Sequence, residues 1–557
     1  GSEMCIRDSV TLSNIVRGVT SATNSQYTSD VYKYVKGTIA SYGGAYFKLA
    51  RSIASIGNIT PIGTISNVFA ATFDGNNNNL SGLNISVAGN NVGLFGYISG
   101  ATIKNLTVNG SVKGSSNVGG VVGYALNSTI ENVTNNASVN ADYTDISYTI
   151  RQVDATPVSG GDKNYPSGEN AYQINDGNVG TKYCGTKKAP MSFIAEINNV
   201  QSIVGFAIQN ATDTSGNPKR TPKKVTIWGS NNGNEIPSES WGQSGGGNKP
   251  TSWSGYTSWV EIYTSDDIKL QSTDNRKNIE FDSTHTYRYY WVYIEGTDKQ
   301  LQFAEFDFLS PRDNIGGVVG YASDTTITTI ANNGSVSGSK NVGGIVGEFN
   351  SLGKSVSGAT NSGAITSSNT AAGIVGKLTE GSISGSKNTG RVTASVATTI
   401  GEKTGAFLGG IAGWANGNVN NCYNSGTVTT ETSWGNSNIV GGIVGFLVNG
   451  KTVSYCYNSG TIVGSSQIGG IIGYLPGART TVTYCYHSGR INSVWNENNV
   501  AKGSLGYITG NDTSVLNSCW ILPGASTDSA SSTKIKTNGR KLEVGQYRYC
   551  LLYTSPS

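Results

Sequence analysis

The chain has 557 residues, a formal net charge of +4 and only 13% charged residues, against roughly 25% in ordinary domains. A charge this small, with no run of Lys or Arg, argues against nucleic acid as a partner, and no apolar run reaches the roughly 20 residues of a membrane span. The 75 glycines and the surplus of Ser, Thr and Asn, with Val and Ile as apolar partners, favour strands and turns over helices.

The two ends of the chain differ in composition from the sequence beside them. Residues 1–9 and 550–557 resemble translated sequencing-adapter tails of the kind found at the ends of metagenomic reading frames. An ordinary disordered terminus or a cloning scar is the alternative. Segments of this kind are set aside when a fold is predicted, and we expect the native protein to extend past both.

Residues 10–75 precede the regular part of the chain and are expected to form an N-terminal cap and lead-in segment. Within them, residues 46–50 are predicted to be a strand because aromatic and apolar side chains cluster there. A solenoid needs an atypical first unit to cover the exposed end of its core. The coils themselves are then predicted to occupy residues 76–142.

A short apolar and glycine-rich segment recurs along the chain at intervals of roughly 25 to 35 residues, a period typical of stacked repeats. Each copy is followed by short segments with period-2 alternation, the pattern of half-buried strands. Three short strands fit one such repeat, which favours a parallel β-helix over a propeller blade of about 40 residues. The clearest copy is residues 440–445, and others start at Val92, Val118, Ile315, Val342, Ala371, Leu408, Ile468 and near Ser504.

Asparagine recurs at one position of the repeat, two residues before a Gly or Ala. Identical amide side chains stacked in register hydrogen-bond to one another, which predicts a ladder through the solenoid. His487 has the same position in a later coil, so we interpret it as a ladder residue and not as a catalytic base. The asparagines of the predicted ladder are Asn135, Asn332, Asn361, Asn388, Asn424 and Asn458.

The repeat disappears between residues 143 and 313, and this stretch holds five of the nine tryptophans. An inserted domain explains the gap, because its two ends can lie close together at a surface loop of one coil. Its strands are predicted to be longer and antiparallel: residues 191–197, 203–208, 224–229, 258–263, 289–294 and 303–308. Coils resume over 314–522, before a C-terminal segment at 523–549. The predicted fold is all-β, a parallel β-helix interrupted by an antiparallel β-sandwich of jelly-roll type.

The repeats resemble GLUG-type β-helix repeats of bacterial cell-surface proteins. The matching residues are Val92-Gly-Leu-Phe-Gly96 and its Gly-Gly relatives, with the preceding Phe69 and Thr72-Phe-Asp-Gly75. This resemblance implies a location outside a bacterial cell, on its surface or secreted. It implies no reaction.

The inserted stretch resembles discoidin domains (coagulation factor 5/8 type C) and the related galactose-binding-like carbohydrate modules. Four motifs carry the resemblance, and together they span nearly all of residues 143–313. They are Asn175-Asp-Gly-Asn178 with Thr181; Arg220-x-Pro222 before Val225-Thr-Ile-Trp-Gly-Ser-Asn231; Tyr287-Arg-Tyr-Tyr-Trp-Val-Tyr293; and Ala304-Glu305.

The resemblance to discoidin domains implies a structural calcium ion between the early Asp-Gly loop and the late Ala-Glu pair. The corresponding residues here, Asp176, Asn178, Thr181 and Glu305, offer the hard oxygen ligands that calcium prefers. The alternative is a β-turn with an Asx hydrogen bond and an unrelated surface glutamate.

The same resemblance places a sugar site in loops at one end of the sandwich. The loop from Asn210 to Asn217, with Arg220, matches the polar binding loop of the family, although Gln209-Asn210 stands where the usual arginine is expected. Trp241, Trp253 and Tyr256 of the long Gly-rich loop are candidates to stack on the sugar in place of the missing family aromatic. The alternative is that these aromatics pack their loop onto the sandwich.

Catalysis is not expected in this chain. It has two histidines, and its glutamates fall at different positions of the repeat, whereas a glycosidase pairs two carboxylates. We expect an extracellular, adhesin-like protein whose stalk presents a module that binds cell-surface or mucus glycans. One alternative is a non-catalytic, substrate-targeting part of a larger secreted glycan-degrading enzyme or protease; another is a structural fibre whose insert binds protein.

Overall fold

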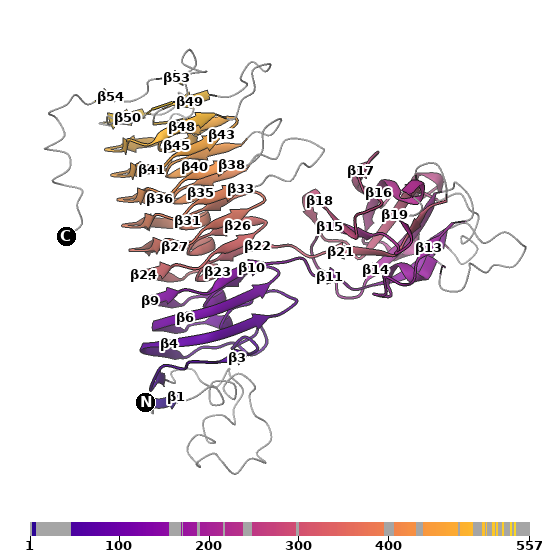
Figure 1. Cartoon of the computed structure of the whole chain (residues 1–557), viewed down its shortest axis with the longest axis horizontal. Coiled ribbons are helices and arrows are strands. Elements are labelled where there is room, and N and C mark those ends of the chain that lie inside the picture. Colours follow the sequence, from indigo (N-terminus) through magenta and orange to yellow (C-terminus); the bar gives the residue numbers. More distant parts are fainter. Residues whose placement is uncertain are drawn as a thin grey trace, which may run out of the picture. The chain divides into compact units, whose positions relative to one another are not determined.

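The computed structural model describes most of the chain between residues 46 and 493, together with short strands at both ends. The described residues are 3–6, 46–154, 169, 171–185, 190–214, 218–237, 248–296, 300–394, 406–430, 438–476, 480–493, 504–506, 508–509, 515–517, 520–521, 526–527, 535–536 and 540–541. They form two compact units, of which one is the sandwich Tyr143–Pro311 and the other is built from the chain on either side of it (Figure 1).

The first unit is a solenoid in which every described pairing between coils is parallel. The recurring glycine-rich segment forms one column, a nine-stranded sheet with Val118, Ile315, Val342, Ala371, Leu408, Val440 and Ile468 in register. The strands of this sheet are β7 (Val118–Gly119), β22 (Asp313–Gly316), β26 (Lys340–Gly343), β30 (Ala371–Ala372), β34 (Phe407–Gly409), β39 (Ile439–Gly441), β44 (Gln467–Gly469), β49 (Ser504–Gly506) and β53 (Ile535–Lys536). The predicted parallel β-helix is therefore confirmed.

The remaining described coil strands belong to one continuous sheet of 34 strands. It begins with β1 (Glu3–Ile6), which pairs with β2 (Tyr46–Leu49), so part of the segment set aside at the N-terminus is a strand. Strands that recur below are β6 (Thr102–Gly114), β9 (Thr129–Asn135), β10 (Ser138–Ala141), β24 (Thr326–Asn332), β25 (Val336–Gly338), β27 (Val346–Ser357), β31 (Val375–Ser384), β35 (Ala412–Ala415), β36 (Asn418–Asn420), β40 (Val444–Leu447) and β41 (Thr452–Ser454).

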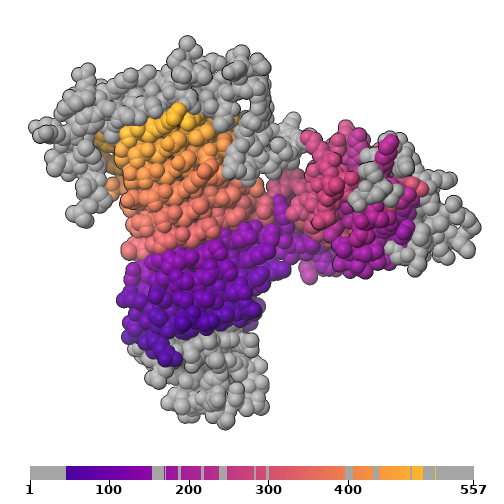
Figure 2. All heavy atoms as spheres, viewed as in Figure 1, coloured from indigo at the N-terminus to yellow at the C-terminus, as the bar shows by residue number. Residues whose placement is uncertain are grey.

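The solenoid passes the inserted sandwich without a break in register. β10 pairs with both β6 and β25, and β9 pairs with β24, although residues 143–311 separate these partners in the sequence. Figure 1 shows the same junction as an abrupt colour change between adjoining coils, and Figure 2 shows those coils packed directly on one another. The coils on the two sides of the insertion are thus consecutive in space.

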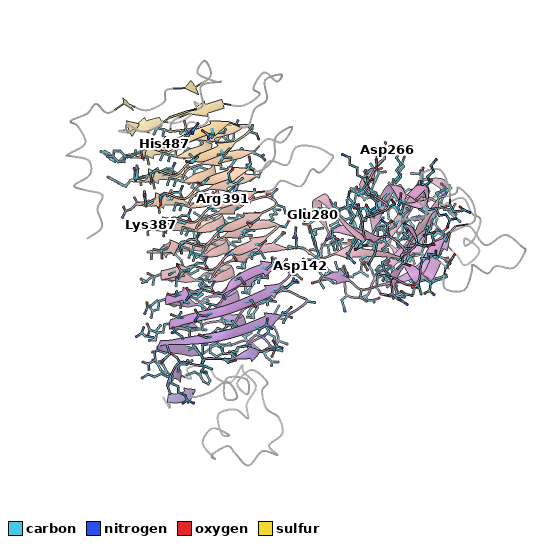
Figure 3. All side chains as sticks on the ribbon, viewed as in Figure 1. Asp142, Asp266, Glu280, Lys387, Arg391 and His487 are labelled. Atoms are coloured by element: carbon cyan, nitrogen blue, oxygen red, sulfur yellow. The ribbon has the colours of Figure 1, made fainter. Side chains whose placement is uncertain are left out.

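The asparagine ladder runs through this junction. Each rung donates its amide Nδ2 to the Oδ1 of the next rung at 2.8 Å, beginning with Asn135 to Asn332. The six asparagines are at most 1% exposed. His487 ends the described ladder, with its Nδ1 3.1 Å from Asn458 Nδ2 (Figure 3). Burial lowers the pKa of His487 to about 4, so its ring is neutral near neutral pH and serves as a rung.

The solenoid core is made of stacked aliphatic side chains, and three cysteines join it as the repeat predicts. Cys422, Cys456 and Cys485 lie in consecutive coils and are buried. Burial raises the pKa of Cys456 well above its ordinary value, and the adjoining thiols add to the rise. These thiols behave as small apolar groups.

The second unit is an antiparallel sandwich with its own core, as the sequence predicts. One sheet has the order β11 (Asp145–Ile146), β21 (Glu305–Leu309), β15 (Ile203–Gln209), β18 (Arg276–His285), and the other has the order β12 (Tyr148–Asp154), β14 (Met191–Ile197), β19 (Tyr289–Gly296), β16 (Pro222–Ser230), β17 (Val260–Ser265). A short pair, β13 (Tyr183–Cys184) and β20 (Gln302–Phe303), lies beside them. The 3₁₀ turns are η2 (Ala171–Asn175), η4 (Pro218–Arg220), η5 (Gly233–Glu235) and η7 (Pro250–Ser252).

Within the described part of the chain, no helix has the length and apolar character needed to cross a membrane.

Candidate ligand-binding site of the inserted domain

Polar side chains from three separate segments of the sandwich form one hydrogen-bonded network. Lys182 Nζ donates to Asp213 Oδ2 at 2.6 Å and lies 3.4 Å from Glu169 Oε1. Gln302 Nε2 donates to Asp213 Oδ1 at 2.6 Å, and Arg220 Nη1 donates to Gln302 Oε1 at 3.1 Å. We call Glu169, Lys182, Asp213, Arg220 and Gln302 the polar network. Only Arg220 among them is a residue that the sequence singled out.

The contact between Asp213 and Lys182 favours the charged form of both groups. Burial opposes ionisation of Asp213, but the hydrogen bond and charge of Lys182 outweigh it and lower the pKa of that carboxyl. Burial likewise opposes the charge on Lys182, and the hydrogen bond to Asp213 together with the charge of Glu169 raises the pKa of the ammonium group. The side chain of Asp213 is 48% exposed, whereas that of Lys182 is 15% exposed. The ionised carboxylate of Asp213 therefore reaches solvent while the less exposed Lys182 holds it in place.

One buried donor of the network is unsatisfied. The Nε of Arg220 has no hydrogen-bond partner among the described residues, and the side chain of Gln302 below it is fully buried. A buried N–H without a partner costs roughly 1 to 3 kcal/mol, so such groups in native proteins call for a ligand or a functional explanation. Asp213 is therefore the anionic acceptor of the network that is open to a polar ligand, and Arg220 supports it through Gln302.

The predicted calcium ligands are brought together. The backbone N–H groups of Gly177 and Asn178 donate to the two carboxylate oxygens of Glu305 at 3.3 and 3.1 Å. Asn178 N also donates to Asp176 Oδ1 at 2.8 Å, and Thr181 Oγ1 donates to Asp176 Oδ2 at 2.7 Å. The Asp-Gly loop after η2 therefore closes over the first residue of β21. A positive φ of 74° at Gly177 gives the loop its tight turn.

The electrostatics of this loop suit a divalent cation. Glu305 is 3% exposed, and its burial together with the adjoining Asp176 carboxyl raises the pKa of Glu305 to about 8. Two neighbouring carboxylates repel each other when both are ionised, and a bound cation would relieve that repulsion. Two carboxylates, an amide and a hydroxyl form an all-oxygen donor set that fits calcium. In the described chain no three His, Cys, Asp or Glu residues lie close enough to hold a metal by themselves.

The calcium loop and the polar network share their supporting segments. Thr181 of the loop precedes Lys182 of the network, and Gln302 of the network lies three residues before Glu305. β13 and β20 hold these two segments side by side, because Cys184 pairs with Gln302 in that ladder.

Trp253 and Tyr256 lie elsewhere in the sandwich. Their rings are 5.6 Å apart, and Tyr256 meets Trp291 of β19 edge to face at 6.3 Å. Trp291 is opposite Trp228, near the end of β16, whereas Arg220 lies before its start. The two aromatics are thus packed with a tryptophan-rich cluster on the sandwich, as the alternative interpretation proposed, and the structure does not bring them to Arg220.

The other predicted sugar-site residues divide into two groups. Asn210 is 7% exposed, and its Nδ2 donates to the backbone oxygens of Gln271 and Asp274 at 2.8 and 2.6 Å, so it ties together two loops. Asn217 and Trp241 lie outside the described residues.

Comparison with known proteins reveals two kinds of similarity. Residues 114–140 match the GLUG motif. Those residues run from the end of β6 to β10, the coil immediately before the insertion. No curated protein matches the chain.

Solved structures that resemble part of the chain are carbohydrate-binding and F5/8 type C domains. A family 32 carbohydrate-binding module of C. perfringens NanJ, solved with galactose, is 14% identical, with 30% of this chain and 93% of that one covered and a TM-score of 0.20. The C-terminal domain of a Bacteroides fragilis chitobiase is 19% identical, covering 30% and 96%, at a TM-score of 0.22. An F5/8 type C domain of B. fragilis is 11% identical, covering 30% and 97%, also at 0.22.

Sequence reasoning missed Lys182, Asp213, Gln302 and Glu169. Lys182 directly follows the calcium motif and Asp213 lies inside the predicted polar loop, so both had a positional signal. Gln302 and Glu169 had none, because their role depends on β13 pairing with β20.

Proposed function

We propose that this chain is an extracellular, adhesin-like bacterial surface protein whose inserted sandwich binds a glycan without catalysis. The observation that supports the proposal is the polar network, in which Asp213 is ionised, half-exposed and held by Lys182 and Gln302. The resemblance of the sequence motifs to discoidin-type carbohydrate modules supports the same assignment. The expected partners are glycans of cell surfaces or mucus.

The chemistry of the polar network suits a sugar. Sugar hydroxyls donate to a carboxylate such as that of Asp213, and hydrogen bonds to charged groups are the stronger ones. Lys182 and Gln302 hold Asp213 from two sides at 2.6 Å, so the acceptor is oriented before a ligand arrives. Such preorganisation lets a shallow site bind with few contacts.

We propose calcium as a structural ion of the same domain, held by Asp176, Asn178, Thr181 and Glu305. When bound, it supplies positive charge that keeps both carboxylates ionised. The Asp-Gly loop then locks onto β21 and holds the Lys182 and Gln302 segments in place. Its role is to support the binding site, and it makes no contact with the glycan in this proposal.

The solenoid is proposed as a stiff stalk. A parallel β-helix with a continuous register and buried amide ladders resists bending, since each coil is bonded to the next along its whole length. Nothing in this role needs an active site. The stalk presents the sandwich away from the cell envelope.

Binding of the whole chain to a panel of immobilised glycans tests the proposal. We expect selective binding of one glycan class, with affinity lowered about tenfold or more by Asp213→Ala because a charge-assisted acceptor is lost. Asp266→Ala is the matched control, since Asp266 is an exposed carboxylate of the same domain that pairs with Lys224 at 2.9 Å. We expect it to change affinity less than about twofold. If the folded protein binds no glycan, or binds equally well after Asp213→Ala, the proposed site is wrong.

A further inference from the structure

A groove crosses four consecutive coils of the solenoid because their turns differ in length. Residues 351–354 of β27 face Gly381 alone in β31, since Asn350 pairs with Glu380 and Ser355 with Ser382. At the other side, residues 416–418 face residues 448–452, which comprise the longer turn between β40 and β41 and the first residue of β41. The two middle turns are therefore short, and longer turns flank them.

Two glycines keep the floor of the groove low. Gly381 has a φ of 100°, a conformation that other residues rarely adopt. A Cβ on Gly417 would lie 2.2 Å from the carbonyl oxygen of Gly381, so only glycine fits between these coils. At the rim, Leu352 is 75% exposed and rises from the longer turn. The floor of the groove is thus formed by short turns and glycines, so its depth does not depend on the rotamer of a side chain.

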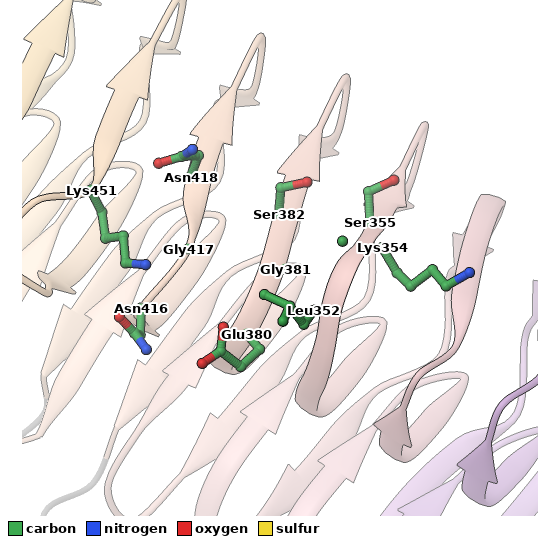
Figure 4. Close-up of a pocket in the computed structure, with 11 residues that line it drawn as sticks. Leu352, Lys354, Ser355, Glu380, Gly381, Ser382, Asn416, Gly417, Asn418 and Lys451 are labelled. Carbon is green, nitrogen blue, oxygen red and sulfur yellow. The ribbon is translucent and has the colours of Figure 1, made fainter.

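The groove has a volume of about 320 Å³, at the lower end of the usual range of small-molecule sites. Its lining is polar apart from Leu352 and the glycines. Lys354 and Lys451 lie toward its two ends, with Glu380 and Asn416 between them (Figure 4). Among the described residues neither lysine forms an ion pair with a carboxylate, which leaves their charges to a ligand.

Each amide side chain of the groove retains one hydrogen-bonding group that can bind a ligand. Asn416 donates its Nδ2 to the Thr379 carbonyl at 3.0 Å, which leaves its Oδ1 as an acceptor. Asn418 accepts from Thr452 N with its Oδ1 at 3.0 Å, which leaves its Nδ2 as a donor. Ser382, on the strand between Ser355 and Asn418, adds a hydroxyl.

We propose that this groove is a second binding site, one that takes an acidic saccharide segment whose sugars carry carboxylates. Lys451 would pair with a carboxylate at one end of the groove, and Glu380, Asn416, Asn418 and Ser382 would bind the hydroxyls. A short apolar patch at Leu352 suits the C–H face of a sugar ring. An acidic peptide is the less suitable ligand, because peptide recognition on β-structures uses open backbone groups of a strand edge, and here the strands that flank the floor are paired with the coils on both sides.

Calorimetric titration of the whole chain with a linear tetramer of galacturonic acid tests this inference. The methyl-esterified tetramer, which lacks the charge, is the ligand control. We expect the acid to bind, the ester to bind at least about tenfold more weakly, and added salt to weaken binding of the acid. Lys451→Glu should reduce affinity about tenfold or more, and Ser382→Tyr should block the floor.

Matched variants separate this site from others. Lys340→Glu changes the net charge by the same amount at an exposed position of β26 outside the groove, and it should alter affinity less than about twofold. Asp213→Ala in the sandwich should leave binding of the tetramer unchanged, so the groove and the proposed glycan site of the sandwich stand or fall separately. Equal binding of acid and ester, unchanged binding in both Lys451→Glu and Ser382→Tyr, or no binding by the folded chain would overturn the proposal.

Discussion

Two neighbouring asparagines of one coil illustrate how the position of a residue in the stack determines its contribution to stability. Asn332 is buried and bonds to Asn135, Asn361 and the carbonyl of Gly334. Asn333 is exposed and bonds to Asn136. The same amide group is therefore buried and bonded to both neighbouring coils at one site, and exposed to solvent at the next.

We predict that Asn332→Ala destabilises the solenoid, because it leaves the partner amides at Asn135 and Asn361 without their hydrogen bonds. Each buried unsatisfied group costs roughly 1 to 3 kcal/mol, whereas Asn333→Ala should fall within about 0.5 kcal/mol. Chemical denaturation of the two variants measures the difference. Equal stability of both variants would show that the buried ladder is not an energetic feature of the stack.

The raised pKa of Glu305 predicts a pH dependence of the cation-free sandwich. The pKa of this carboxyl rises from 4.5 to about 8 in the folded state, so the folded protein holds a proton that the unfolded chain releases. Stability from this group is complete below about pH 4.5 and is lost as pH rises through 8. Asp307, whose pKa burial raises to about 6, acts in the same direction at lower pH. In chelator, the melting temperature of the sandwich should therefore fall between pH 6 and pH 8, where Glu305 is the group of the two that still contributes.

Calcium should remove this fall, because a bound cation replaces the proton between Asp176 and Glu305. We expect calcium to raise the melting temperature at pH 8 and to flatten its dependence on pH. Glu305→Gln, which cannot ionise, should lose both the slope and the response to calcium. A slope that persists in Glu305→Gln, or a melting temperature indifferent to calcium in the unsubstituted chain, would contradict the calcium proposal.

At the scale of strands, the sequence was sufficient to predict the solenoid, because the same repeat unit recurs many times along the chain. The alternation of apolar residues and the constant phase of glycine and asparagine place Val118, Ile315 and Val342 in one column, as observed. In the sandwich, the strand predicted at residues 191–197 matches β14 at both ends, since its apolar run is bounded by polar turns.

The candidate site was predicted only in part, for reasons that lie in long-range contacts. The calcium residues lie in compact motifs, and the structure brings them together. The polar network joins residues 169, 182, 213, 220 and 302, and no local pattern encodes that meeting. Trp253 has the aromatic ring that stacking on a sugar requires, yet this ring packs against Tyr256.

The continuity of β9 with β24 and of β10 with β25 predicts that the sandwich is dispensable for the solenoid. Replacing residues 143–311 by a short Gly-Ser linker should leave a folded solenoid whose melting temperature changes by no more than about 4 °C. The excised sandwich, with a core of its own, should melt as a separate cooperative unit. Failure of the solenoid to fold without the insert would contradict the view that its coils are consecutive.

The whole molecule combines a solenoid of stacked coils with one inserted sandwich. Repetition gives the body its stiffness, and the loop position of the insert frees the module from the demands of stacking. The proposed function combines these features, with the sandwich binding a glycan and the solenoid serving as its stalk at a bacterial surface. The proposed groove, lined by residues between 352 and 451, would add a second binding site on the solenoid, one that takes an acidic saccharide.

The most direct test of the central claim compares three proteins on one glycan array: the whole chain, the solenoid without residues 143–311, and the whole chain with Asp213→Ala. The account predicts selective binding by the whole chain to a glycan that the other two no longer retain, with all three shown to be folded. Retention of that same glycan by the solenoid alone, or no binding by any of the three, would contradict the claim that the inserted sandwich is the glycan-binding module.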